Sequence, residues 1–324
     1  MRPATLGRVI AIIGGLGAAV LWAVSTLCSS RSSRMLGSRV VIAWVMVIGA
    51  IVGMPLAIAS PAPMEITPLA AGLLLLTGTC YVVGLNLTYA ALTIGKVSVV
   101  APIVATEGGV AALIAVALGD TIGLVAGVML IVIAAGVVLA SLEPARPEVP
   151  AGGIDITADA LEGPAVPDPI DATTAPPAAA RTASAADTRR AASLSIAAAL
   201  VFGVGLVATG KAAVLMPVAW VAVAARLIGV VAVAMPLIAQ RRFRVTRAAL
   251  PLVLIAGTGE VFGSMLSAWG SRESIAITAV LGSQFAAIAA VAAFILFGER
   301  LSRTQIIGVV LIGAGVTALA AATA

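Results

Sequence analysis

The sequence contains no histidine, only two cysteines and no H-E-x-x-H or G-x-S-x-G motif. Zinc, haem and iron–sulfur centres are held mainly by histidine and cysteine, so the composition leaves these groups without a ligand set. The two cysteines, Cys28 and Cys80, lie in separate apolar runs and are expected to be free. We therefore expect no metal and no other cofactor, and an enzyme active site has little support.

Charged residues are also scarce in this sequence. Asp, Glu, Lys and Arg make up 10% of the chain, whereas a soluble domain carries about 25%. Apolar residues make up 61%, and the mean hydropathy is +1.16. Such a chain cannot cover a water-exposed surface, so it is predicted to be an integral membrane protein. The net charge of +5 does not indicate nucleic-acid binding, because the basic residues stand between apolar runs without interleaved aromatics.

Ten apolar runs are long enough to approach the roughly 20 residues that a spanning helix needs. They cover about 7–27, 39–59, 67–91, 97–118, 121–142, 193–213, 217–239, 248–269, 274–297 and 303–323. Residues 143–192 interrupt this pattern with Pro, Ala, Asp and Thr at low hydropathy and without periodicity. This segment is predicted to be a disordered linker between five helices on each side.

The two halves repeat each other. Residues 78–120 align without a gap on residues 257–299, at an offset of 179 at both ends. The matching positions include Gly78-Thr79 with Gly257-Thr258, Gly84 with Gly263, and Gly119-Asp120 with Gly298-Glu299. Trp22-Ala23-Val24 and Met54-Pro55-Leu56 recur as Phe202-Gly203-Val204 and Met235-Pro236-Leu237 at nearly the same spacing. We expect two structurally similar units, residues 1–142 and 193–324.

Five helices is an odd number, so two copies in one chain must cross the membrane in opposite senses. The basic residues agree, because the loops rich in arginine in one half correspond to poor loops in the other. The odd-numbered loops hold 14 Lys and Arg residues, and the opposite side holds 4. The positive-inside rule then places the odd-numbered loops and the linker in the cytoplasm and both termini outside.

The segment after the ninth run resembles a family signature. It reads Gly298-Glu299-Arg300-Leu301-Ser302 and continues with glycines at 308 and 315, and a matching version around Gly119-Asp120 closes the first half. Together with ten helices in two repeats, this is similar to the drug/metabolite transporter superfamily, in its ten-helix EamA branch. The resemblance implies a secondary transporter, often an exporter of small metabolites, with helices of both repeats around a central cavity.

Two features depart from that family pattern. The ninth run lacks the usual proline, since Pro251 is the last in the chain, and the corresponding site of the fourth run holds Glu107. The usual topology of the family has both termini in the cytoplasm, opposite to what the charges of this chain indicate.

Three charged side chains stand deep inside apolar runs: Glu107, Arg226 and Glu260. Each such charge costs about 2.5–3.5 kcal/mol at mid-helix on insertion scales, so it needs a reason. One interpretation is an ion pair of Arg226 with a glutamate that only locks helices together. The other places these groups on a cavity, where a carboxylate exchanges a proton during alternating access and the arginine binds a carboxylate or phosphate of the substrate.

Helix periodicity adds a polar stripe to Glu260. Ser264, Ser267 and Ser271 follow it at i+4, i+7 and i+11, and the repeat equivalent of Glu260 is Tyr81. Small hydroxyls often serve helix packing alone, so the carboxylate carries the argument. Trp22 and Gln284 are further candidates to line a cavity.

These observations predict an all-α polytopic membrane protein with ten transmembrane helices arranged as two inverted five-helix repeats. The predicted function is secondary transport of a small metabolite by alternating access, with export as the expected direction and proton coupling as an option. A channel or a non-transporting scaffold is the alternative. The expected partners are a small-molecule substrate, protons and the lipid bilayer of the plasma membrane, with no nucleic acid, in a monomer or homodimer.

Overall fold

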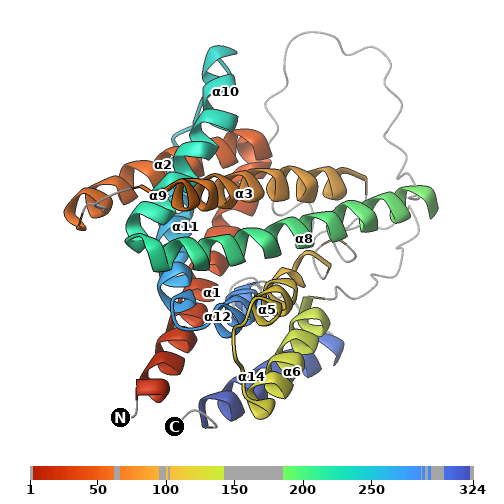
Figure 1. Ribbon diagram of the computed structural model, residues 1–324. Coiled ribbons are helices and arrows are strands. Elements are labelled where there is room, and N and C mark those ends of the chain that lie inside the picture. The colour runs from red at the N-terminus through yellow and green to blue at the C-terminus, as the bar shows by residue number, and fades with distance from the viewer. Residues whose placement is uncertain are drawn as a thin grey trace, which may run out of the picture.

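The structure is a computed structural model that describes residues 3–61, 66–94, 100, 103–141, 185–285, 287–288, 291–292 and 303–321. Every regular element in these residues is helical (Figure 1). The first half contains α1 (Pro3–Leu36), α2 (Ser38–Ala59), α3 (Pro68–Ile94), α5 (Glu107–Ala117) and α6 (Leu124–Ser141). The second half contains α8 (Ala185–Leu215), α9 (Val218–Gly229), the π-helix η1 (Val230–Ala234), α10 (Met235–Ala239), α11 (Leu250–Ser271), α12 (Ile275–Gly282) and α14 (Arg303–Ala321).

Each of the ten predicted apolar runs contains at least one of these helices, and α9, η1 and α10 together fill the seventh run. Within the described part of the chain, six helices are long and apolar enough to cross a membrane by length and composition. They cover Leu6–Ser33, Ser38–Ala59, Pro68–Thr88, Arg189–Leu215, Val218–Ala239 and Leu250–Ser271. The predicted class of an all-α polytopic membrane protein is confirmed.

The predicted linker, residues 143–192, lies outside the described residues up to residue 184. Its last part is helical, because α8 begins at Ala185 and carries Asp187 in its first turn. An acidic side chain near a helix N-terminus is favourable, since it faces the positive end of the helix dipole. Hydropathy alone placed the helix start too late, because this first turn is polar.

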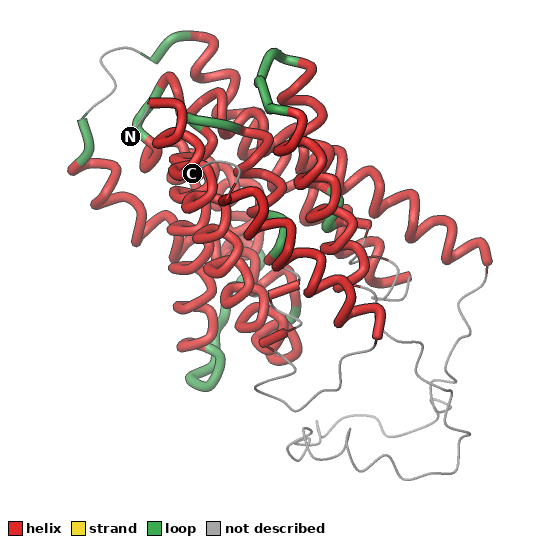
Figure 2. The backbone as a smooth tube through the Cα atoms, turned by 90° about the horizontal axis from the view of Figure 1, so that it is seen from below, coloured by secondary structure: helices red, strands yellow, loops and turns green. Residues whose placement is uncertain are grey.

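The helices of one half pack mainly on helices of the other. The most extensive contacts are those of α1 with α11, α3 with α8, and α6 with α14 (Figure 1). Figure 2 shows from another side that the described chain consists of helices joined by loops. Exchanging the two halves turns the first pair into the second and leaves the third unchanged. The pairs α2 with α11 and α1 with α12 likewise have the counterparts α9 with α3 and α8 with α5. The packing pairs therefore mirror each other between the two halves of the sequence.

Glycine makes the closest of these contacts possible in both halves. A Cβ atom at Gly263 of α11 would lie 2.7 Å from Nε1 of Trp22 on α1. At the equivalent Gly84 of α3, it would lie 2.6 Å from Cε1 of Phe202 on α8. Real Cβ contacts are longer than this, so an aromatic ring on one helix requires glycine on the facing helix at both places.

The two chain ends lie at the same end of the molecule, opposite to the end of α10 (Figure 1).

Polar side chains cap several helix ends. Asp120 Oδ2 accepts hydrogen bonds from the Ala276 amide at 3.0 Å and from Ser274 Oγ at 3.2 Å, at the start of α12. Arg272 donates to the carbonyls of Ala213 and Met216 at the end of α8, at 2.6 and 2.8 Å. These groups satisfy backbone atoms that helix termini leave without intrahelical partners.

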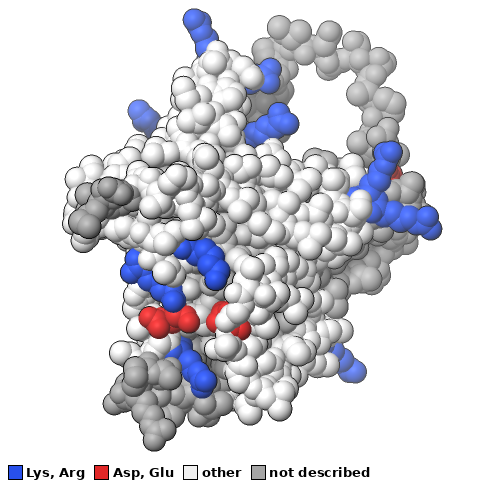
Figure 3. Space-filling model, in the orientation of Figure 1, with Lys and Arg blue, Asp and Glu red and all other residues white. Residues whose placement is uncertain are grey.

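The face seen in Figure 3 is mostly uncharged, with lysine and arginine at its upper and right edges and a group of basic and acidic side chains on its lower part. Large apolar side chains on the outside include Leu113, Leu124 and Ile131, each more than two-thirds exposed. Exposed leucine and isoleucine on this scale suit a lipid environment rather than water.

Candidate functional site

Four helices bring polar side chains to one point inside the protein. The polar cluster consists of Ser25 on α1, Tyr81 on α3, Arg226 on α9, and Glu260 and Ser264 on α11. It forms there because α11 packs against both α1 and α9, and α3 packs against α9. The sequence predicted four of these five residues.

Arg226 is the most enclosed member, at 1% exposure. Its Nη2 donates to the Glu260 carbonyl at 3.1 Å and to Ser264 Oγ, and lies 3.4 Å from Glu260 Oε1. Its Nε finds no acceptor among the described residues. Within that part of the chain, Arg226 and Glu260 form the one ion pair. The guanidinium therefore uses Nη2 as a donor and keeps a spare donor at Nε.

Tyr81 touches both members of the ion pair. Its hydroxyl donates to Glu260 Oε1 at 2.8 Å, and its ring centroid lies 4.8 Å from the Arg226 guanidinium carbon. A guanidinium over an aromatic face is held by a cation–π attraction, which strengthens away from water. Tyr81 and Glu260 are separated by 179 residues, which is the repeat offset. The two repeat-equivalent positions are therefore in direct contact where the halves meet.

Ser25 is the member that the sequence analysis missed. Its Oγ lies 3.0 Å from the Ala256 carbonyl and 3.3 Å from Glu260 Oε2. A signal existed, because Ser25 follows Trp22 by three residues and so shares a face of α1 with it. A single serine in an apolar helix is too common to be noticed without knowing which helix it faces.

Glu107 does not join the polar cluster by a bond. It is 8% exposed, it is the first residue of α5, and its carboxylate accepts no hydrogen bond among the described residues. It lies close enough to Glu260 for the two carboxylates to interact electrostatically. The chain turns at Ala105-Thr106, where the Thr106 amide and hydroxyl both bond the Ile103 carbonyl. Glu107 therefore stands at the N-terminus of the helix that follows a break, where a carboxylate is favourable.

The remaining predicted site residues do not join the polar cluster. Ser267 lies on α11 at 3% exposure. Trp22 packs edge-on against Phe285, with ring centroids 6.4 Å apart, and its Nε1 has no acceptor among the described residues. Gln284 is 2% exposed, and its Nε2 has none there either.

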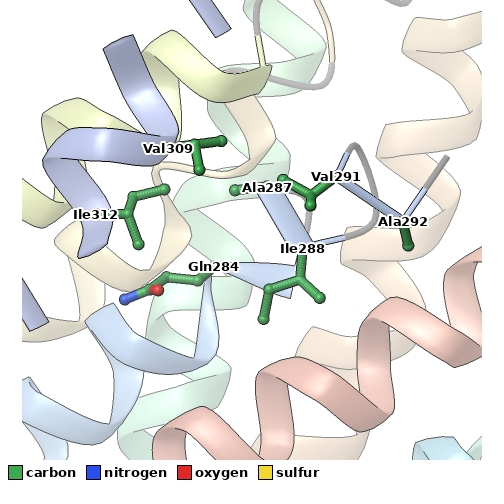
Figure 4. Close-up of a pocket in the computed structure, with 7 residues that line it drawn as sticks. All are labelled: Gln284, Ala287, Ile288, Val291, Ala292, Val309 and Ile312. Carbon is green, nitrogen blue, oxygen red and sulfur yellow. The ribbon is translucent and has the colours of Figure 1, made fainter. Parts of the chain in front are cut away.

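Two hollows lie near these residues, and both are apolar. One, of about 340 Å³, lies between the segment after α12 and α14, with Gln284 at its edge (Figure 4). Its other lining residues are aliphatic, and the Gln284 amide points away from Val291 and Ala292 (Figure 4). The other, of about 690 Å³, lies between α1 and α11 and is lined by residues such as Leu21, Ile255 and Phe262. Neither hollow is lined by Arg226 or Glu260.

The polar cluster surrounds the Glu260 carboxylate with hydrogen-bond donors. Glu260 is 12% exposed and has donors from three other helices, so its carboxylate is positioned from several directions at once. A buried ion pair in an apolar membrane protein adds little stability over a well-packed apolar pair. Its retention in the interior therefore indicates a role for the charges themselves.

Comparison with known proteins agrees with this architecture. No curated protein matches the chain. Fifteen chains of solved structures match it. One of these, described as "Crystal structure of protein", covers 95% of this chain and 95% of its own, with a TM-score of 0.68 and 16% sequence identity. That likeness shows a shared fold. Residues 9–142, the first predicted repeat, match the EamA-like transporter family.

Proposed function

We propose that the protein is a secondary transporter that moves a small polar or amphipathic metabolite across the plasma membrane by alternating access, with export as the expected direction. The family of the first repeat supports membrane transport. The mirrored packing pairs support two equivalent units, residues 1–142 and 193–324, that move against each other. A monomer already contains both units, and a homodimer would add nothing to the polar cluster.

The observation that carries the proposal is the contact of Tyr81 with Glu260 beside the buried Arg226. The contact lies where the two units meet, which is where transporters built from repeats place substrate and coupling ions. A purely structural ion pair could have formed between any two neighbouring helices. In this one, the carboxylate of Glu260 also accepts a hydrogen bond from Tyr81, its repeat-equivalent position, which carries different chemistry.

Glu260 is the proposed proton-coupling residue, with Arg226, Ser264 and Tyr81 as its immediate partners. Glu107, Ser267, Trp22 and Gln284 are proposed as a surrounding shell that shapes the substrate path. A carboxylate that gains a proton on one side of the membrane and releases it on the other couples transport to a pH gradient.

The test uses the purified protein in proteoliposomes. A counterflow screen over amino acids, nucleosides and cationic dyes identifies a solute that exchanges across the bilayer. With that solute, Glu260→Gln should retain the fold and exchange but lose accumulation driven by a pH gradient. Glu273→Gln is the matched control, because Glu273 is an exposed carboxylate just beyond the end of α11. Unchanged pH-driven accumulation in Glu260→Gln would contradict proton coupling at this residue.

A further inference from the structure

The two halves are not packed equally around the polar cluster. Helix α11 packs against α8 and α9 of its own half. Its repeat equivalent α3 has no contact of comparable extent with α1 or α2 among the described residues. Alternating access in a two-repeat transporter exchanges the arrangements of the halves. In the other state α11 would separate from α9, and the Arg226–Glu260 pair would open.

The Tyr81–Glu260 contact behaves differently. Its two residues occupy equivalent positions, 179 residues apart, so exchanging the halves maps the contact onto itself. The hydrogen bond from Tyr81 can therefore persist in both states while the guanidinium leaves. Once the pair opens, the carboxylate of Glu260 and the guanidinium of Arg226 each need another group to neutralise their charge.

The Glu260 end is prepared for a proton. The Ser25 hydroxyl has one hydrogen and two acceptors in reach, the Ala256 carbonyl at 3.0 Å and Glu260 Oε2 at 3.3 Å. When the hydroxyl donates to the nearer Ala256 carbonyl, its lone pairs face Oε2. A proton on Oε2 would then be donated to Ser25, while Oε1 continues to accept from Tyr81.

Other ionisable groups do not supply an alternative counter-charge. Glu107 of α5 interacts electrostatically with Glu260, and its negative charge disfavours a second carboxylate beside it. Cys28 of α1 packs in the apolar cluster of α2, and Cys80 of α3 faces Gly205 of α8. Lys211 of α8 is exposed. Helices α2 and α12 bring no titratable side chain into this part of the structure.

The Arg226 end is prepared for an anion. The side chain is 1% exposed and its Nε has no acceptor among the described residues. Once the Glu260 carboxylate leaves, Nε and Nη2 offer two adjacent donors, the arrangement that binds a carboxylate or phosphate in bidentate fashion. A buried guanidinium without any anion would be strongly disfavoured.

Building on the transport function proposed above, we infer that the substrate carries a carboxylate or phosphate group that takes the place of Glu260 on Arg226 while Glu260 binds a proton. The proton and the anion bind in the same step and leave in the same step. For a monovalent anion, no net charge crosses the membrane. Export of a metabolic acid then proceeds together with a proton whenever the outward gradient of the acid exceeds the inward proton gradient.

The exchange of carboxylates on Arg226 can be tested without knowing the substrate. Glu260→Ala removes the native carboxylate and leaves space for acetate. We expect acetate, at about ten times its dissociation constant, to raise the melting temperature of this variant by about 3–5 °C, and the uncharged isostere acetamide to leave it unchanged. The double variant Arg226→Gln/Glu260→Ala should lose the difference between acetate and acetamide.

Glu260→Gln provides the same comparison if the alanine variant does not fold, because glutamine preserves the shape of the site. Equal effects of acetate and acetamide in the folded variant would overturn the inference. The wild-type protein should show no acetate-specific rise, since its own carboxylate occupies Arg226.

Flux measurements separate this inference from the transport function. In proteoliposomes we expect counterflow of at least one anionic probe among pyruvate, inorganic phosphate and glutamate, and accumulation of that anion when the outside is acidic. Counterflow confined to uridine, choline or ethidium would overturn the anionic substrate but leave the transporter. Absence of counterflow for all six probes, in vesicles that contain folded protein, would contradict the transport function itself.

Discussion

Helix α2 and the segment formed by α9, η1 and α10 are repeat-equivalent transmembrane elements. The second is longer than the first by one residue. Arg226 lies against Gly49, and Met46 lies against Gly229, so these contacts correspond at an offset of 180. Met54-Pro55 and Met235-Pro236 correspond at 181. The extra residue must fall between them in the second half, and η1 (Val230–Ala234) occupies that interval. A π-turn takes one more residue than an α-turn, so the helix absorbs the insertion locally.

The difference teaches what the duplicated fold constrains and what it leaves free. Close helix contacts through glycine are kept in both halves. The polar chemistry is not, because the positions equivalent to Arg226, Glu260 and Ser264 hold Met46, Tyr81 and Leu85. Packing must be symmetric for the halves to join in the same way. One charged pair suffices for a single site between them, and a second would bury two more charges.

The largest effect is expected when Arg226 is replaced by methionine, the residue at the equivalent position of the first half. Arg226→Met should lower the free energy of unfolding by about 3–5 kcal/mol, because it leaves the Glu260 carboxylate without its cation. The double variant Arg226→Met/Glu260→Gln should recover most of that loss. Thermal unfolding in detergent measures both. A single variant as stable as wild type would mean that Glu260 is already neutral beside Arg226.

The glycine contacts should respond equally in the two halves. Gly263→Ala places a methyl group against Trp22, and Gly84→Ala places one against Phe202. Each should destabilise the protein by about 1–3 kcal/mol, the usual range for overpacking. Adding Trp22→Phe to the first variant or Phe202→Leu to the second should restore part of the loss. A large effect in one half alone would show that the packing equivalence is only approximate.

A smaller effect is expected at the contact between equivalent positions. Tyr81→Phe keeps the ring under Arg226 and removes the hydroxyl that donates to Glu260. We expect a loss of about 1 kcal/mol in stability, since Arg226 and Ser25 still serve the carboxylate. Asn86→Ala, an exposed change on the same helix, is the control. The transport rate in proteoliposomes should fall although the variant remains folded. An unaltered rate would show that Tyr81 has no role in transport.

The smallest effect on stability is expected from deleting the inserted residue. Removing Val231, a 62% exposed residue within η1, should change the free energy of unfolding by less than about 0.5 kcal/mol. The deletion restores the length that α2 already has. Removing the similarly exposed Ile51 from α2 should be far more disruptive, because no π-turn absorbs it and the following residues rotate by about 100°. Comparable melting temperatures for the two deletions would contradict the conclusion that η1 accommodates an inserted residue.

The sequence predicted most of the polar cluster because intramembrane charge is rare. Arg226 and Glu260 were visible as charges in apolar runs, Ser264 by its spacing, and Tyr81 only as the repeat equivalent of Glu260. The contact between Tyr81 and Glu260 could not be predicted, since it depends on which faces of α3 and α11 turn towards each other. Ser25 was hidden for the same reason, and the pairing of Arg226 with Glu260 rather than Glu107 likewise depends on how the helices pack.

By itself, the sequence determined the membrane environment, the helical class and the duplication, because hydropathy and an internal repeat are properties of the chain alone. The tertiary structure decided which helices of the two halves lie together, where the inserted residue is absorbed, and which partners surround Glu260. Helices in lipid associate through close packing and hydrogen bonding rather than through burial of an apolar face. Their pairing therefore leaves little trace in the hydrophobic pattern, and only the assembled helices reveal it.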